Sequence, residues 1–467
     1  MASILIKDGF IATMDTQQTV LQQGDILIQN DRIQEIAKKI NPSVPPDQIL
    51  DAKHKVVLPG FVNTHAHLQQ YFRGLYELIG EFYDVNLPLE GYRQPQDMEY
   101  LGLASCAELI QGGCTTSVIL YTYPDGFARA AEQAGIRVLL AADIEEVNLE
   151  KLREGIYEYM PQKGEAGFQR AVDLHRDWHG KANGRITTLM MPKAADLTLP
   201  ETYRKCKTFA DQHGLLISSH VSQSGQELRQ VQKLYKKTPP QHLFDLGILD
   251  NNFLAAHCAY ATDQDLALIH KTGTRILQCR FLYSPFVRWM EMGIPISLGT
   301  DDYFHDMLMM FRELIAGQAD RAAHQLDSAE QFFAANRITR RPSAYEMLEL
   351  ATRKGAEAIH READIGSLEV GKKADLILID TMNPFITPTM DPLTSVVLYG
   401  SSNDIKTVIV DGQILKKDGE FTTLDLNSTL TTAQTYVEEI LDRFFKEHPH
   451  QKEIWTKKTM YLHGFNQ

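Results

Sequence analysis

The side chains best suited to chemistry are four histidines and one aspartate, and each follows an apolar run of the chain. The five residues are His65, His67, His220, His257 and Asp301. In an extended strand, residues i and i+2 point to the same side, so His65 and His67 can face one common point. Histidine nitrogens together with a carboxylate are the ligands that a divalent transition ion takes in a catalytic site. The pattern therefore predicts a metal centre.

The predicted chemistry is the activation of water. A bound divalent cation lowers the pKa of water from about 15.7 to about 7, and it also polarises the group that is attacked. We expect Asp301 to take a proton from this water and His257 to hold the water or to shuttle the proton. A second His-x-His sequence, His448-Pro449-His450, lies in a polar tail and is predicted to be surface.

Eight apolar, strand-like runs occupy the middle of the chain and are separated mainly by helical segments. The helical segments include Met98–Gln111, Leu199–Gln212 and Asp263–Lys271. This alternation predicts a parallel sheet, and eight such units are the count of a (β/α)8 TIM barrel, whose catalytic end is the carboxyl end of its strands. The eight runs are Val56–Val62, Thr115–Leu120, Arg137–Ile144, Arg185–Met191, Leu215–Ser219, Phe253–Ala256, Thr274–Gln278 and Pro295–Gly299.

Both ends of the chain are rich in short strands and tight turns. We predict that residues 1–58 and 362–425 form one small composite β-sandwich domain. Residues 59–361 then form the metal-dependent barrel, and 426–467 form a C-terminal helical extension with an amphipathic helix at 431–448.

Several motifs resemble the amidohydrolase superfamily. They are Leu58–Leu68 with Arg73-Gly74, Gly299-Thr300-Asp301, and Ile365–Leu376. Over about residues 1–425 the chain is most similar to the branch that holds triazine hydrolases, S-adenosylhomocysteine and guanine deaminases, and phenylurea and thiocarbamate hydrolases. The resemblance implies a barrel with a composite β-sandwich and, usually, one metal ion. It makes His65, His67, His220 and Asp301 ligands and places His257 against the water or on the metal.

The sequence departs from the deaminases of this branch at Gln223. Those relatives carry His-x-x-Glu after the fifth strand, where the glutamate protonates a ring nitrogen; this chain has His220-Val221-Ser222-Gln223. Glutamine can donate a hydrogen bond but delivers no proton, and losing a general acid typically costs about 10²–10⁴-fold in rate. We expect Gln223 to orient the substrate. The segments Met191-Pro192-Lys193 and Gln278-Cys279-Arg280-Phe281 also differ from the relatives.

Other residues are predicted to line the substrate site. Lys193 is either a solvated or substrate-facing loop lysine or is carboxylated in a two-metal site, and the first interpretation fits the one-metal branch. Tyr71 belongs to an aromatic run after His67 that forms either a wall over the substrate or a packed loop. His305, with Asp302, is predicted to line the pocket, and Cys258 and Cys279 are predicted to be small buried side chains.

Three functional hypotheses follow. The first is a metal-dependent hydrolase that cleaves a C–N or C–S bond of a small amide, urea or (thio)carbamate, because a carbonyl polarised by metal needs no ring protonation. The second is a deaminase or dehalogenase of a triazine, purine or pterin-like heterocycle. The third is a non-catalytic barrel, but the presence of all five ligand-type residues argues against it. One divalent ion is expected, with zinc first and cobalt, iron and manganese as alternatives.

Composition excludes several other classes. The 467 residues carry a net charge of −13, which argues against nucleic acid as the partner. No apolar run approaches the roughly 18 residues of a membrane span, and the N-terminus shows no secretory signal. Five cysteines without Cys-x-x-Cys spacing favour a reducing cytoplasm over a disulfide framework. We expect a cytoplasmic enzyme for a small molecule, assembled as a homo-oligomer (a dimer or a tetramer).

Overall fold

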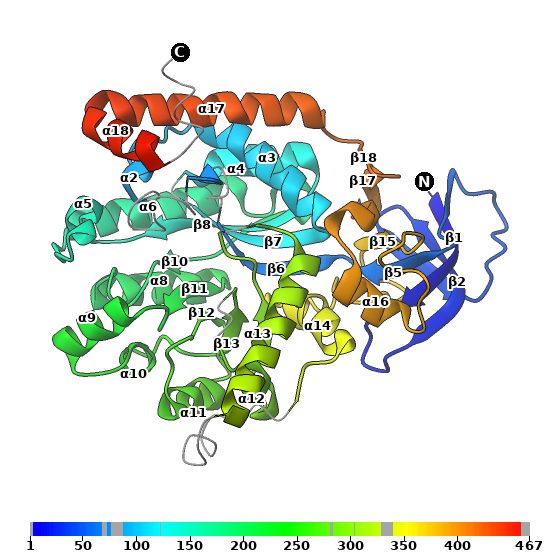
Figure 1. The fold of residues 1–467 in the computed structure, drawn as a ribbon, viewed down its shortest axis with the longest axis horizontal. Helices are drawn as coiled ribbons and strands as arrows, with labels where there is room; N and C mark the ends of the chain where they lie inside the picture. The colour runs from blue at the N-terminus through cyan, green and yellow to red at the C-terminus, as the bar shows by residue number, and fades with distance from the viewer. Residues whose placement is uncertain are drawn as a thin grey trace.

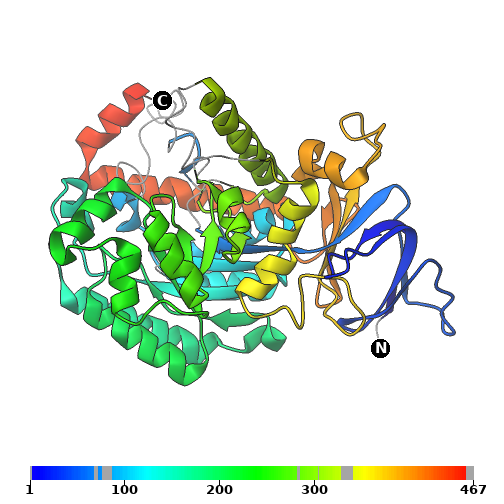
Figure 2. The same cartoon turned by 90° about the horizontal axis from the view of Figure 1, so that it is seen from below.

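The structure is a computed structural model with a mixed α/β fold, as the alternation of elements predicts. It describes residues 3–67, 72–75, 87–121, 123–280, 284–302, 304–327 and 340–458. Figure 1 shows a nine-stranded sheet at one end of the molecule and the parallel strands with their helices at the other. In Figure 2 the green and teal helices lie around the parallel strands.

The nine-stranded sheet combines strands from both ends of the chain. Its order is β18-β17-β16-β15-β5-β1-β2-β3, with β4 paired to β1, and β15 joins β5 in antiparallel register. The strands are β1 (Ser3–Ala12), β2 (Val20–Gln29), β3 (Arg32–Ala37), β4 (Gln48–Asp51), β5 (Lys55–Pro59), β15 (Leu376–Asp380), β16 (Ile405–Val410), β17 (Gln413–Lys417) and β18 (Glu420–Phe421).

The middle of the chain forms two sheets of parallel strands. One has the order β10-β8-β7-β6 with β9 paired to β8, and the other has the order β11-β12-β13-β14. Parallel bridges join them on both sides, between Met190 and Ile217, between Ala194 and His220, and between Ala66 and Asp301. The strands are β6 (Phe61–Ala66), β7 (Cys114–Tyr121), β8 (Arg137–Ile144), β9 (Ile186–Thr188), β10 (Met191–Pro192), β11 (Ile217–Val221), β12 (Phe253–His257), β13 (Arg275–Gln278) and β14 (Ile296–Leu298).

Helices follow most of the parallel strands, and local signals fix where several begin. Thr262 and Thr238 are the N-cap residues of α11 and α10, and each forms a capping box. Helices α4, α6 and α8 each begin with a proline. The helices are α2 (Leu87–Glu90), α3 (Asp97–Gln111), α4 (Pro124–Ala134), α5 (Leu149–Arg153), α6 (Pro161–Trp178), α7 (Lys181–Gly184), α8 (Pro200–His213), α9 (Gly225–Tyr235), α10 (Pro239–Asp245), α11 (Asp263–Thr272), α12 (Phe286–Glu291), α13 (Met307–Asp327), α14 (Ala344–Leu350), α15 (Arg353–Ala358), α16 (Pro392–Tyr399), α17 (Leu426–Glu447) and α18 (Pro449–Lys458).

The apolar run Val56–Val62 was predicted to be one strand, but it divides at Gly60 into β5 and β6. A Cβ on Gly60 would lie 2.1 Å from the side chain of Thr115, so only glycine allows the chain to pass from one sheet to the other. Similarly, the run Arg185–Met191 contributes two short strands, β9 and β10. The remaining six runs each overlap one parallel strand.

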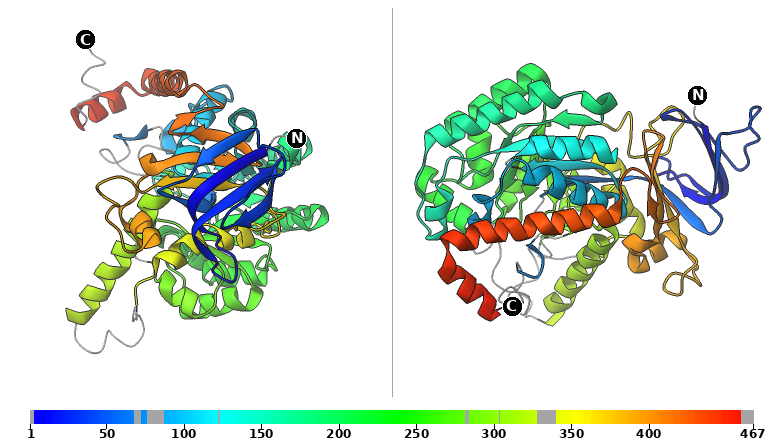
Figure 3. Two further views of the ribbon diagram at one scale, coloured as in Figure 1. Left: turned by 90° about the vertical axis from the view of Figure 1, so that its right-hand side faces the viewer. Right: turned by 90° about the horizontal axis from the view of Figure 1, so that it is seen from above.

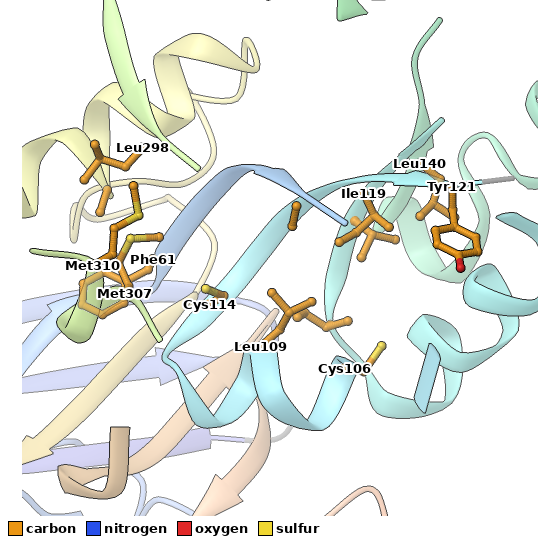
Figure 4. Packing of buried hydrophobic residues seen from close by; sticks show 14 of the residues in the cluster. Phe61, Cys106, Leu109, Cys114, Ile119, Tyr121, Leu140, Leu298, Met307 and Met310 are labelled. Atoms are coloured by element: carbon orange, nitrogen blue, oxygen red, sulfur yellow. The ribbon is translucent and has the colours of Figure 1, made fainter. Parts of the chain in front are cut away.

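The core lies between the parallel strands and their helices. Figure 4 shows Cys114, Ile119 and Tyr121 of β7 on the same side as Cys106 and Leu109 of α3. Alternate residues of β7, such as Val118 and Leu120, belong to a different apolar cluster. For Ile119 and Tyr121 on one side and Val118 and Leu120 on the other, this division follows from the two-residue period of a strand.

A buried ion network joins the two parts of the chain. Arg137, at the start of β8, donates to Asp375 from Nε at 3.2 Å and from Nη2 at 3.1 Å. Its Nη2 also lies 2.5 Å from Asp411. All three side chains are almost fully buried, and both carboxylates come from the nine-stranded sheet region. Charges that are buried this deeply must remain paired.

The C-terminal amphipathic helix predicted at 431–448 is α17. Its apolar face, which includes Val437, Ile440 and Phe444, is buried against the chain itself, where α17 packs on α3 and α18 (Figure 3). His448 and His450 are exposed, as predicted, although α18 rather than an irregular tail begins there. Within the described ranges, no helix is long and apolar enough to cross a membrane.

Candidate metal centre

His65 and His67 lie at the carboxyl end of β6, where they are interlocked with Asp301. The backbone N–H of Asp301 donates to the carbonyl of His65 at 3.0 Å, and the N–H of His67 donates to the carbonyl of Asp301 at 3.1 Å. The Nε2 atoms of the two histidines are 3.1 Å apart. The Oδ1 atom of Asp301 lies 3.9 Å from Nε2 of His65 and 3.7 Å from Nε2 of His67. The neighbouring ends of β6 and β14 therefore bring three candidate ligands together.

His220 is held by the chain segment that follows β10. Its Nδ1 lies 2.7 Å from the backbone carbonyl of Lys193, so Nδ1 carries the proton and the lone pair is on Nε2. This Nε2 is 3.2 Å from Nε2 of His67. The ring of His67 likewise donates to the backbone of Leu120. Two lone pairs therefore face each other, and this arrangement is stable when a cation lies between them.

His257 is the last residue of β12 and lies beside the other candidate ligands. Its Nδ1 lies 3.7 Å from Oδ2 of Asp301, and its ring centroid is 5.3 Å from those of His65 and His220. His257 and Asp301 both have positive φ angles, of 76° and 63°. Strained backbone of this kind persists where the surrounding structure holds a side chain in one required direction.

Burial keeps the four rings neutral. Burial, reinforced by the charge of Lys193, lowers the pKa of His67 to about 3. Burial and His67 lower the pKa of His220 to about 3, and burial places the pKa values of His65 and His257 well below the usual value. Neutral imidazole is the form that binds a metal ion. Burial and the nearby Asp302 raise the pKa of Asp301, so a bound cation would stabilise its ionised form.

Cys279 is a member of the group that the sequence interpretation did not place there. Its Sγ and the ligand atoms of His65, His257 and Asp301 all lie within 4.8 Å of one another. The side chain is fully buried, as predicted, and Sγ lies 3.5 Å from the carbonyl of Leu277. The sequence could have predicted this position, because Cys279 directly follows β13 and Asp301 follows the neighbouring strand β14.

The Lys193 side chain is engaged by carboxylates. Its Nζ lies 3.2 Å from Asp143 and 2.7 Å from Glu145, and Glu145 also binds Lys163 at 2.8 Å. Burial would lower the pKa of Lys193, but the two carboxylates outweigh this effect and raise it well above the usual value. Carboxylation would place another negative charge beside Asp143 and Glu145, so the geometry favours the free ammonium.

The other predicted site residues have different surroundings. Gln223 is partly exposed just beyond β11, and its backbone N–H donates to Glu227 at 2.8 Å. His305 is fully buried, with Nδ1 2.8 Å from the Thr300 hydroxyl. This burial favours a positioning role for His305 over the predicted contact with substrate. Tyr71 lies outside the described residues.

The chain belongs to the amidohydrolase family, whose model matches residues 56–415. The family comprises enzymes that act on C–N bonds, and the resemblance in the sequence is thereby confirmed.

Curated relatives cover nearly the whole chain. A 5'-deoxyadenosine deaminase of Methanosarcina mazei is 30% identical over 455 residues, which are 95% of this chain and 99% of the relative. A 5-methylthioadenosine/S-adenosylhomocysteine deaminase of Caldanaerobacter subterraneus is 30% identical over 444 residues, 91% of this chain and 95% of the relative.

Among solved structures, an adenosine deaminase from Xanthomonas campestris with bound zinc gives a TM-score of 0.81 at 20% identity. The match covers 94% of this chain and 99% of the other. Atrazine chlorohydrolase from Arthrobacter aurescens, in complex with zinc, gives 0.78 at 21% identity over 93% and 100% of the two chains. At these identities the likeness concerns the fold.

Proposed function

We propose that the protein is a metal-dependent hydrolase that uses water to cleave a C–N bond of a small molecule. One divalent ion is held by His65, His67, His220 and Asp301, with His257 beside it. The observation that carries this proposal is the convergence of ring nitrogens of His65, His67 and His220 at 3.1 and 3.2 Å. Zinc is the proposed ion, and zinc-bound structures of the same fold support the choice.

We further propose that the two parallel sheets are one (β/α)8 barrel, because bridges join them on both sides. The mixed nine-stranded sheet supports a composite β-sandwich domain from residues 1–58 and 362–425, beside a barrel of residues 59–361 and a helical extension over 426–467. The carboxyl ends of barrel strands are where such enzymes place their sites.

We propose a separate role for each residue of the site. A bound divalent ion supplies Lewis acidity, which acidifies water and polarises the substrate. Asp301 is proposed to take the proton from water, and His257 holds that water by a hydrogen bond or passes the proton on. The carbonyl of Lys193 fixes the ring of His220. Gln223, just beyond β11, is proposed to hydrogen-bond the substrate without transferring a proton.

The substrate proposed first is an amide, urea or (thio)carbamate, which can be cleaved at a C–N or C–S bond without protonation of a ring. The amide of Gln223 supports this choice, since it delivers no proton. The second candidate is a heterocycle deaminase or dehalogenase. The deaminase names of relatives that are 30% identical over nearly the whole chain favour it.

A substrate panel with zinc-loaded protein tests the proposal. Release of ammonia from 5'-deoxyadenosine or an aminotriazine would favour the second candidate. Turnover restricted to ureas, amides and carbamates would favour the first. No turnover of any compound by protein that contains stoichiometric zinc would contradict both.

Cytoplasmic location and homo-oligomeric assembly, as a dimer or a tetramer, are also proposed. Five free, buried cysteines support a reducing compartment. The amphipathic C-terminal helix was one reason to expect assembly, but the apolar face of α17 is covered by the chain itself. The exposed side chains of Phe385 and Met390 offer another apolar surface. Sedimentation of a single-chain species at micromolar concentration would refute the oligomer.

A further inference from the structure

Arg93, between α2 and α3, is a buried cation, and two of its guanidinium nitrogens have no hydrogen-bond partner in the part of the chain that the structure describes. Only 3% of the residue is exposed. Its guanidinium lies 5.4 Å from the ring centroids of both Phe72 and Tyr121, and Nη1 donates to the Tyr121 hydroxyl. In contrast, Nε and Nη2 have no hydrogen-bond partner in the structure as described. Buried polar groups are nearly always bonded, so these two neighbouring donors are suited to a polar ligand.

The two unbonded nitrogens form one edge of the guanidinium. Elsewhere in the chain the same edge binds carboxylates. Arg137 presents Nε and Nη2 to Asp375 at 3.2 and 3.1 Å, and Arg280 presents them to Glu313 at 2.6 and 3.3 Å. Two parallel N–H groups match the two oxygens of a planar carboxylate. The open edge of Arg93 therefore has the geometry of a carboxylate site.

Arg93 lies at the same end of the strands as the metal centre. Its partner Tyr121 is the last residue of β7, where Figure 4 shows it beyond Ile119. The preceding residue, Leu120, accepts a hydrogen bond from His67. The charge of Lys193 acts on both His67 and Tyr121. A molecule bound at Arg93 is thus placed near the ligand side chains.

Three carboxylates lie in this region, and one of them, Glu90, acts electrostatically on Tyr121 and Lys193. Asp143 and Glu145 bind Lys193, and Glu145 also binds Lys163. The hydroxyl of Tyr121 is neutral, because burial, the main effect on this group, raises its pKa. No carboxylate within the described part of the chain forms an ion pair with Arg93 at 4 Å or less. Its positive charge is therefore not cancelled by direct contact.

We propose that Arg93 binds a carboxylate of the substrate through Nε and Nη2. The substrate class is then a small molecule that carries both a hydrolysable C–N bond and a carboxylate. The substrate part of this inference rests on the proposed function, whereas the anion site itself does not. The rings of Phe72 and Tyr121 flank the guanidinium and limit the access of water to it.

Calorimetric titration with benzoate, and with benzamide as its neutral analogue, tests the anion site without any need for turnover. The zinc-loaded full chain is compared with Arg93→Met and with Arg129→Met, which removes an exposed charge paired with Glu99. We expect wild type and Arg129→Met to bind benzoate at least about tenfold more tightly than Arg93→Met, and benzamide to show no such difference. If benzoate bound to the metal instead, wild type and Arg93→Met would have equal affinity for it. That result would overturn the proposal.

Two further measurements separate the remaining explanations. Arg93→Lys keeps the charge but loses the paired N–H groups, so its affinity for benzoate should fall between those of wild type and Arg93→Met. With whichever panel compound is turned over, benzoate should raise KM and leave kcat unchanged, as expected for a substrate carboxylate. A lowered kcat at constant KM would identify a separate effector site and overturn the assignment to substrate.

Discussion

Replacing Lys193 with methionine should destabilise the protein while leaving its metal in place. The substitution removes a buried ammonium from Asp143 and Glu145, which lie 3.2 and 2.7 Å away. Breaking a buried ion pair on one side costs about 3–5 kcal/mol. Glu145 keeps Lys163 at 2.8 Å, so mainly Asp143 is left uncompensated. We therefore expect the lower end of the range, about 3 kcal/mol.

The pH dependence of this loss follows from the raised pKa of Lys193. A lysine whose pKa is higher in the folded state contributes stability that is complete below its unfolded value of about 10.4. The contribution is lost only as the pH rises through the higher folded value. The difference in stability between wild type and Lys193→Met should consequently be constant at neutral pH and shrink only in strong alkali.

Urea unfolding, followed at several pH values, measures the effect. Lys205→Met is the matched control, because Lys205 pairs with Glu165 on the exposed surface and should contribute little. The backbone carbonyl that orients His220 remains in Lys193→Met, so the zinc content should stay at that of wild type. A stability equal to that of the control would refute the ion-pair reasoning. Loss of one of two bound ions would instead indicate a carboxylated lysine.

Three further predictions concern other parts of the molecule. Arg137→Met leaves Asp375 buried without its cation, whereas Asp411 keeps Lys373 at 3.5 Å and Arg185 at 3.9 Å. The substitution should lower the free energy of unfolding by about 3 kcal/mol, and a change under about 1 kcal/mol would contradict the importance of the network. The proposed ligands are ring nitrogens and a carboxylate, and Sγ of Cys279 instead donates to the carbonyl of Leu277 at 3.5 Å, so cobalt-loaded protein should lack sulfur-to-cobalt charge-transfer absorption; a strong band that Cys279→Ser removes would make the sulfur a ligand. Gln223→Glu should lower kcat/KM on the native substrate and Asp301→Asn should nearly abolish it; if Gln223→Glu raises turnover and adds an acidic-limb pKa, the deaminase proposal becomes the better one.

Local patterns were sufficient to predict the candidate site. His65, His220, His257 and Asp301 each follow a short apolar run, and the ends of parallel strands meet on one side of a sheet. The structure brings these side chains together as that argument requires. The position of these residues at strand ends was therefore enough to predict that they meet, while their role as metal ligands stays a prediction.

Contacts between distant parts of the chain could not be predicted in this way. The run Val56–Val62 is apolar throughout, and its division became visible only in the pairing: β5 pairs with β1 and β15, whereas β6 pairs with β7. Arg137 and Asp375 are far apart in the sequence, as are Arg93 and the phenol it binds. In the sequence, charged residues such as Arg137, Asp375 and Arg93 cannot be distinguished from surface residues, and only the fold shows that they are buried.

The central claim is that His65, His67, His220 and Asp301 hold one metal ion. Metal analysis of purified wild type, His220→Ala and the surface variant His450→Ala tests it most directly. We predict about one zinc ion per chain in wild type and in His450→Ala, and almost none in His220→Ala. Full zinc content in His220→Ala, or no stoichiometric metal in wild type, would contradict the account.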